Sequence, residues 1–247
     1  MACLAIESLS LAAANKSTPP QTVEHETARQ AGMVAIPTGS YHPFFKRADD
    51  AQELPVDAFR LDAAPVTKFQ YLEFVRSHAT WRKSRIKGLL AERNYLADWV
   101  DDLDPGADLQ GPVTFVSWFA ARAYCGERGR LPSVAEWERV AGATPDSTPL
   151  LHDANPAKPF QFAMGKLAAD VGTIPLQFGG VWEWTEDFNS TPSMSTKENA
   201  RSDSSLFCGD GYRSNNAADY AAFLRYSLRS SLRANYALKN LGFRCAH

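Results

Sequence analysis

The chain has 247 residues, of which 45% are apolar, and its formal net charge is −2. This apolar fraction supports a sizeable hydrophobic core, while near-neutral charge excludes a disordered polyelectrolyte and a nucleic-acid surface built on positive charge. No uninterrupted apolar run is long enough to span a membrane. Gly and Pro number 15 each and are spread along the chain, so we expect little regular secondary structure.

The first thirty residues differ in composition from the rest. A mildly apolar stretch ends in Ala12–Ala14 and is followed by a polar, proline-containing segment, which resembles the end of a secretory signal peptide with its small-residue cleavage site. We therefore expect residues 1–30 to be a residual signal peptide and disordered leader, and residues 31–247 to be one domain. Glu7 interrupts the apolar stretch, so a plain disordered N-terminus is the alternative.

The first predicted helix follows residue 67. Thr67 and Gln70 have the spacing of a capping box, in which each residue's side chain bonds the other's backbone N–H. The helix that they begin would turn an apolar stripe inward, made of Phe69, Leu72 and Phe74 or Val75.

Two more helices are predicted from their caps. Ser117 can cap a helix over residues 118–128, which Gly129 would end. Ser133 and Glu136 form a second capping box directly after Pro132, and they predict a turn followed by a helix up to residue 142. Caps and apolar stripes are required by folding alone, so these helices are expected to belong to the core.

Five segments, in order, resemble the formylglycine-generating enzyme (sulfatase-modifying factor) family. They are MVAIPTGSY at 33–41, VDAFRLDAAPVTKFQYLEFV at 56–75, PVTFVSWFAARAYCGERGRLPSVAEWERVAG at 112–142, GGVWEWTEDF at 179–188 and NLGFRCA at 240–246. The resemblance implies the α+β fold of that family, a relative of C-type-lectin-like folds with little regular secondary structure.

The resemblance also implies a role for the cysteines. Cys125 and Cys245 occupy positions that are bridged in the family, and such a bridge requires an oxidising compartment, in agreement with export to the periplasm. Cys3 would leave with the leader or carry a lipid. Cys208 is then left over as a candidate reactive thiol.

The chain departs from the family between Cys208 and Arg229, within the segment SLFCGDGYRSNNAADYAAFLRYSLRSSLR at 205–233. Formylglycine-generating enzymes carry two cysteines in this segment that bind copper(I) and activate oxygen. Counting forward from Tyr212 places Ser214 and about Asp219 at these positions, and counting back from Gly242 places Asn216 and Ala221 there. A copper(I) site requires soft thiolates, so we expect neither copper nor conversion of a sulfatase cysteine to formylglycine.

The same segment supplies the candidate cleft. Its predicted catalytic residues are a thiol, two proton acceptors and a phenol, namely Cys208, Asp210, Asp219 and Tyr220. Aromatic faces and guanidinium groups suit a planar, partly anionic ligand, so the predicted substrate-binding residues are Trp182, Tyr212, Ser214, Arg225 and Arg229. Alternatively, arginines of this region pair with carboxylates to hold the fold together, which is the favoured interpretation for Arg244.

Calcium is the cofactor that the sequence suggests, and Asp153, Asn155 and Asp170 are possible ligands of a second calcium site besides the one at Glu183. Glu183, with the carbonyl groups of Gly179 and Val181, would supply part of an oxygen cage. In the alternative interpretation Glu183 braces the turn. The chain has no G-x-G-x-x-G segment after a strand, so no flavin or nicotinamide is expected.

Export, the missing cysteine pair and the segment DYAAFLRYSLRSSL at 219–232 most resemble the periplasmic pyoverdine-maturation branch of the family. That branch implies oxidation of dihydropyoverdine to the pyoverdine chromophore, with oxygen, a metal or a partner oxidase as electron acceptor. The expected partners are a small-molecule or peptide siderophore precursor and other periplasmic maturation enzymes. The alternatives are a non-catalytic ligand-binding module on the same fold and an accessory maturation factor of denitrification.

Overall fold

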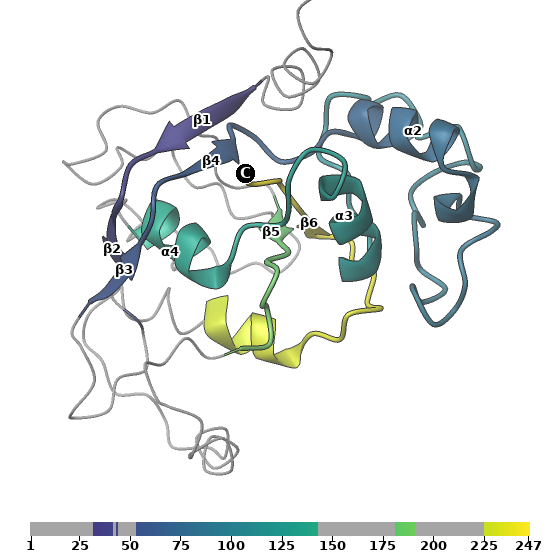
Figure 1. Cartoon of the computed structure of the whole chain (residues 1–247). Helices are drawn as coiled ribbons and strands as arrows, with labels where there is room; N and C mark the ends of the chain where they lie inside the picture. The colour runs from purple at the N-terminus through teal and green to yellow at the C-terminus, as the bar shows by residue number, and fades with distance from the viewer. Residues whose placement is uncertain (1–31, 42, 44–52, 143–180, 191–224) are drawn as a thin grey trace, which may run out of the picture.

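The computed structural model describes residues 32–41, 43, 53–142, 181–190 and 225–247 (Figure 1). These residues form short strands and short helices joined by irregular segments, as expected for an α+β protein with little regular structure. The strands are β1 (Met33–Ile36), β2 (Gly39–Tyr41), β3 (Leu54–Val56), β4 (Phe59–Asp62), β5 (Trp182–Glu183) and β6 (Leu241–Gly242). The helices are α2 (Lys68–Ser77), the 3₁₀ turn η1 (Ala79–Trp81), α3 (Trp118–Cys125) and α4 (Val134–Gly142), and residues 225–231 are also helical.

The N-terminal strands form a bent antiparallel ribbon. β1 pairs with β4 from Met33 opposite Asp62 to Ile36 opposite Phe59, and β2 pairs with β3. The last residues of the chain then join β4, because Arg60 and His247 exchange two backbone hydrogen bonds of 2.8 and 2.9 Å. The C-terminus therefore lies beside β4 (Figure 1).

Two glycines lie where a side chain would have no room. Gly129 has a φ of +154°, and a Cβ atom at this position would lie 2.1 Å from the carbonyl oxygen of Ala246. Gly39 lies under the guanidinium group of Arg139, at 1.9 Å from where its Cβ would be. Side chains at either position would separate elements that the fold brings into contact.

Helix α2 confirms the first predicted capping box. Thr67 accepts from the N–H of Gln70, and the Gln70 side chain accepts from the N–H of Thr67. Leu72, Phe74 and Val75 are buried as predicted, but Phe69 is 45% exposed, so its place in the inward stripe was wrong. Tyr71 occupies the core instead: it lies two positions, about 200°, around the helix from Phe69.

Helices α3 and α4 also begin at their predicted caps. Ser117 accepts from the N–H of Ala120, and Ser133 and Glu136 make the reciprocal bonds of a capping box at 3.1 and 2.8 Å. The predicted end of α3 at Gly129 was wrong. The helix ends at Cys125, and the chain leaves it through a turn that brings Gly129 to the C-terminal segment.

The buried apolar residues gather in two clusters. The larger one packs α2 and α3 against Trp99, Trp184 and Phe243, and the smaller one packs the N-terminal ribbon against Trp137 and Val140 of α4. Cys125 and Cys245, both fully buried, form the disulfide that the family resemblance implied. None of the helices in the described ranges is long and apolar enough to cross a membrane.

Candidate functional site

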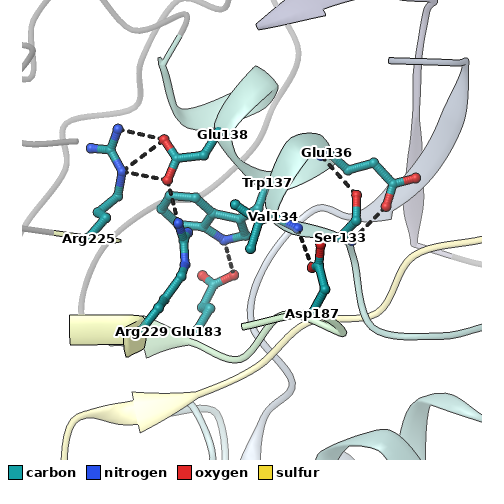
Figure 2. A network of polar contacts seen from close by, with 9 residues as sticks. All are labelled: Ser133, Val134, Glu136, Trp137, Glu138, Glu183, Asp187, Arg225 and Arg229. Carbon is teal, nitrogen blue, oxygen red and sulfur yellow. Dashed lines mark hydrogen bonds and ion pairs between the residues drawn. The ribbon is translucent and has the colours of Figure 1, made fainter. Parts of the chain in front are cut away.

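A polar network surrounds Trp137 on helix α4 (Figure 2). The helix lies against β2 and β3, and this contact fixes the direction of the Trp137 side chain. Two guanidinium groups lie over the indole ring, with the carbon Cζ of Arg229 at 4.9 Å and that of Arg225 at 5.8 Å from the ring centroid. Both distances are in the range of a cation–π contact. The helix at residues 225–231 therefore packs against Trp137 through these two arginines.

Glu138, the next residue of α4, binds both arginines. Its carboxylate accepts from Nε and Nη2 of Arg225, at 2.7 Å for the shortest of these bonds, and from Nη1 of Arg229 at 2.5 Å. Burial acts to raise the pKa of Glu138, but the charges of the two arginines outweigh it and lower the pKa from 4.5 to about 2. Glu138 is therefore an anion at any physiological pH.

These contacts bear on the predicted substrate-binding roles of Arg225 and Arg229. The two side chains are only 6% and 9% exposed, and each forms an ion pair with Glu138. The alternative interpretation, in which they hold the fold together, thus describes at least part of what they do. Arg225 and Arg229 therefore do not line an open cleft as free guanidinium groups.

Glu183 on β5 lies on the other side of Trp137. Its Oε2 accepts from Trp137 Nε1 at 2.9 Å and from Arg244 Nε at 2.6 Å, and its Oε1 accepts from Arg244 Nη2 at 2.7 Å. Arg244 and Glu183 are 0% and 1% exposed as side chains, so this pair is fully buried.

The calcium site predicted at Glu183 does not fit this arrangement. Both carboxylate oxygens already accept from Arg244, and a divalent cation there would lie against a guanidinium group. Val181 is half-buried just before β5, and Gly179 lies outside the described residues. The described ranges contain no group of three or more His, Cys, Asp or Glu side chains placed to hold a metal ion.

Asp187 and Tyr41 complete the surroundings of the network. Asp187 accepts from the N–H of Val134 at 2.7 Å and so caps α4 from 53 positions away in the sequence. The hydroxyl group of Tyr41, on β2, is buried and has no hydrogen-bond partner. Burial, and after it the negative charges of Glu138 and Asp187, raise the pKa of Tyr41 well above its usual range, while Arg229 acts in the opposite direction.

Trp182 opens β5, where its N–H donates to the carbonyl oxygen of Asn240 at 2.7 Å. Its side chain is half-buried and packs against the larger core cluster. The remaining predicted site residues lie outside the described part of the chain, and their roles stay predictions: Cys208, Asp210, Tyr212, Ser214, Asp219 and Tyr220.

The amino-acid sequence shows which cysteines are available as ligands of copper(I). Residues 209–244 contain no cysteine, and the cysteine that follows, Cys245, is bonded to Cys125. Cys208 is thus the one thiol in the segment, whereas linear copper(I) coordination needs two soft ligands. The chain's residues do not fit the copper site.

Sequence reasoning missed Glu138, Trp137 and Tyr41. Glu138 is separated from Arg225 by 87 positions and from Arg229 by 91, so no local spacing connects them. Two acidic residues flank Trp137, and the first of them, Glu136, was assigned to the cap. That assignment leaves Glu138 without a local role, which is the one signal that the sequence offered.

Comparisons with known proteins agree on one family. A model of the sulfatase-modifying factor enzyme 1-like domain matches residues 18–170. The chain is 28% identical over 276 residues to the inactive C-alpha-formylglycine-generating enzyme 2 of Mus musculus, covering 89% of this chain and 86% of that protein. It is 29% identical to the Bos taurus protein of the same name, covering 87% of each. It is 26% identical over 285 residues to the formylglycine-generating enzyme of Mus musculus, covering 87% of this chain and 74% of that protein.

Proposed function

Because the chain belongs to the family of formylglycine-generating enzymes and sulfatase-modifying factors, we propose that it is a tailoring protein of siderophore maturation that does not generate formylglycine. One observation carries the second half of this proposal: residues 209–244, where the family's copper-binding pair belongs, contain no cysteine. Hydroxyl, amide and methyl groups do not replace thiolates as ligands of copper(I).

The proposed substrate is dihydropyoverdine, and the proposed reaction is its oxidation to the pyoverdine chromophore in the periplasm. This oxidation removes two electrons and two protons from the substrate. Dioxygen accepts both and leaves as hydrogen peroxide. Asp210 or Asp219 would accept a proton from the substrate, and Tyr212 or Tyr220 would relay it.

Support for a ligand of this kind comes from the chemistry around Trp137. A catechol-like chromophore is planar and partly anionic, and it suits aromatic faces and guanidinium groups. Arg225 and Arg229 lie at the end of the altered segment and stack on an indole ring. Their ion pairs with Glu138 hold them in fixed positions, so neither has to be ordered by the ligand.

A non-catalytic ligand-binding protein, or an accessory maturation factor, is the second candidate. It is favoured by the two relatives of 28% and 29% identity whose names describe them as inactive. A protein of this kind would bind the precursor and present it to a partner enzyme. Binding would then occur without chemical conversion.

Deletion of the gene in its host, followed by mass spectrometry of the siderophore intermediates, tests the proposal. The expected result is accumulation of the dihydro precursor and loss of the mature chromophore. Purified protein with dihydro precursor and dioxygen then separates the two candidates, because the binding protein retains the precursor unchanged. A deletion strain that makes normal amounts of mature siderophore would contradict both forms of the proposal.

A further inference from the structure

The large apolar side chains that are exposed in the described ranges all lie between residues 69 and 103. They are Phe69, Leu89, Val100 and Leu103. Val100 and Leu103 are 73% and 39% exposed and belong to one tight turn, which is closed by a hydrogen bond of 2.9 Å from the N–H of Val100 to the carbonyl oxygen of Asp104. This turn, residues 100–104, therefore presents an apolar tip to solvent.

An open surface depression of about 650 Å³ lies at this turn. It is lined from the turn by Asp101, Asp102 and Leu103, and from the segment after η1 by Arg82, Lys83 and Ser84. Asp102 accepts from the N–H and the hydroxyl group of Ser84, at 2.7 and 2.6 Å, and so joins the turn to the facing segment. In the view of Figure 1, the segment after α2 lies at the edge of the molecule, and α3 lies between it and α4.

The depression also contains charges of both signs that form no ion pair in the part of the chain that the structure describes. Lys83 donates to a backbone carbonyl oxygen, that of Trp99, at 2.7 Å, and Arg82 likewise donates to backbone carbonyl oxygens. Asp101 accepts from the backbone N–H of Leu103 at 2.8 Å. These bonds hold the three side chains in place beside the apolar tip, and none of them joins a cation to a carboxylate.

A surface of this kind is complementary to a second copy of itself. Around a two-fold axis, a contact between two different residues occurs twice, once in each direction. The apolar tip of one copy can then enter the depression of the other, with Asp101 of each copy opposite Lys83 of its partner. A partner that carries one sign of charge would compensate either the cations or Asp101, whereas a second copy compensates both.

We propose that the turn at residues 100–104 and the depression beside it form a two-fold symmetric interface between two copies of this chain. This inference goes beyond the proposed function and does not depend on it. The interface is small, so the dimer should be weak and in exchange with the monomer. The network around Trp137 lies outside this interface, and both copies would keep it accessible.

Sedimentation equilibrium of the full chain, from micromolar to millimolar protein, tests the proposal. The average mass should rise with concentration from that of the monomer towards twice that value. Added salt should weaken the association, because charge pairs between exposed groups are screened. A chain that remains monomeric at every concentration overturns the proposal, and this is the result expected if the depression takes a small ligand or another protein.

Charge reversal tests which residues meet across the two-fold axis. Asp101→Lys and Lys83→Glu each place like charges opposite one another twice in the dimer, so each variant alone should dimerise about tenfold more weakly. An equimolar mixture of the two variants should associate again, since both contacts of the mixed dimer then join opposite charges. A change within one copy cannot produce this rescue. A mixture that associates no better than its components overturns the proposal.

Val100→Asp is the third variant, and it keeps the test decisive if a charge-reversal variant fails to fold. It places a carboxylate at the apolar tip, on a side chain that is already 73% exposed, and should abolish the dimer. Leu89→Asp is the matched control, because Leu89 is 82% exposed and does not line the depression. It should leave the association unchanged. A dimer that survives Val100→Asp would form through another face and would overturn the proposal.

Discussion

Arg244 illustrates at the scale of one residue how the fold uses buried charge. Its guanidinium group is fully buried, and it donates to both oxygens of Glu183 and to the backbone carbonyl oxygen of Asp62. One side chain thus connects the end of β4, the β5 strand and the segment after β6. An arginine suits this place because its planar, always charged group offers five donors in fixed directions.

We expect Arg244→Met to lower the free energy of unfolding by about 3–5 kcal/mol, since it leaves the Glu183 carboxylate buried without its cation. Urea unfolding followed by fluorescence measures the change. Arg122→Met is the control: Arg122 forms an ion pair with Glu186 with a side chain that is 59% exposed. An exposed pair of this kind contributes less than about 1 kcal/mol. Equal losses in the two variants would contradict the assigned role of Arg244.

The lowered pKa of Glu138 predicts that the free energy of unfolding depends on pH. Its pKa in the folded protein is lowered from 4.5 to about 2, so its contribution is fully present above pH 4.5 and is lost as the pH falls toward 2. Glu136, whose pKa is also lowered, contributes in the same direction. Unfolding free energies measured between pH 5 and pH 2 should fall less steeply in Glu138→Gln than in the unchanged protein. Parallel curves would show that the two arginines do not act on this carboxylate.

At the scale of helices and strands, the sequence predicts those features that depend on residues close together in the chain. The N-caps of α2, α3 and α4 were all predicted, because a cap depends on residues three positions apart that stay together in any fold. The end of α3 was predicted at Gly129, and this was wrong because the helix ends at Cys125. That end depends on Gly129 meeting Ala246, which is 117 positions further along the chain and brought there by the tertiary fold.

The same reasoning explains what was missed in the candidate site. The ion pairs of Glu138 with Arg225 and Arg229 join elements far apart in the sequence, and the parallel pairing of β5 with β6 does so as well. Hydrophobic periodicity and cap spacing contain no information on such contacts. The family resemblance did predict that Cys125 and Cys245 are bonded. A family has a known tertiary fold, whereas the spacing of residues in one sequence carries no such information.

Thr67→Ala should lower the free energy of unfolding by about 1 kcal/mol, because it removes the bond to the N–H of Gln70 at the start of α2. Thr67→Ser keeps the hydroxyl group and should retain most of the stability. Thermal unfolding of the three proteins at one pH compares them. If the serine variant is as unstable as the alanine variant, the methyl group of Thr67, and not its hydrogen bond, is what the helix requires.

At the scale of the whole molecule, the disulfide closes a very long loop. Cys125 and Cys245 are 120 positions apart, and the chain-entropy model gives about 5 kcal/mol for a loop of this length. We expect the double variant Cys125→Ser, Cys245→Ser to lose a large part of that stability. The comparison is made by denaturant unfolding under non-reducing conditions. Free thiols recovered at both positions from protein folded in an oxidising compartment would contradict the bridge.

The molecule as a whole combines a family fold with an altered chemical segment. The caps, the buried Glu183–Arg244 pair and the disulfide all lie in segments that resemble the family. The difference that we propose lies in residues 205–233, which contain one cysteine, Cys208. A fold can be retained when a site loses its chemistry, since stability depends on contacts that the reaction does not use.

The central claim is that this family member does not generate formylglycine, and one measurement tests it most directly. The purified, disulfide-bonded protein is loaded with copper(I) and incubated in air with a sulfatase-motif peptide, and the peptide is then analysed by mass spectrometry. We expect the peptide cysteine to remain unconverted and the copper to be removed by a chelator. Formylglycine in the peptide, formed by the unchanged protein and absent with Cys208→Ser, would contradict the claim.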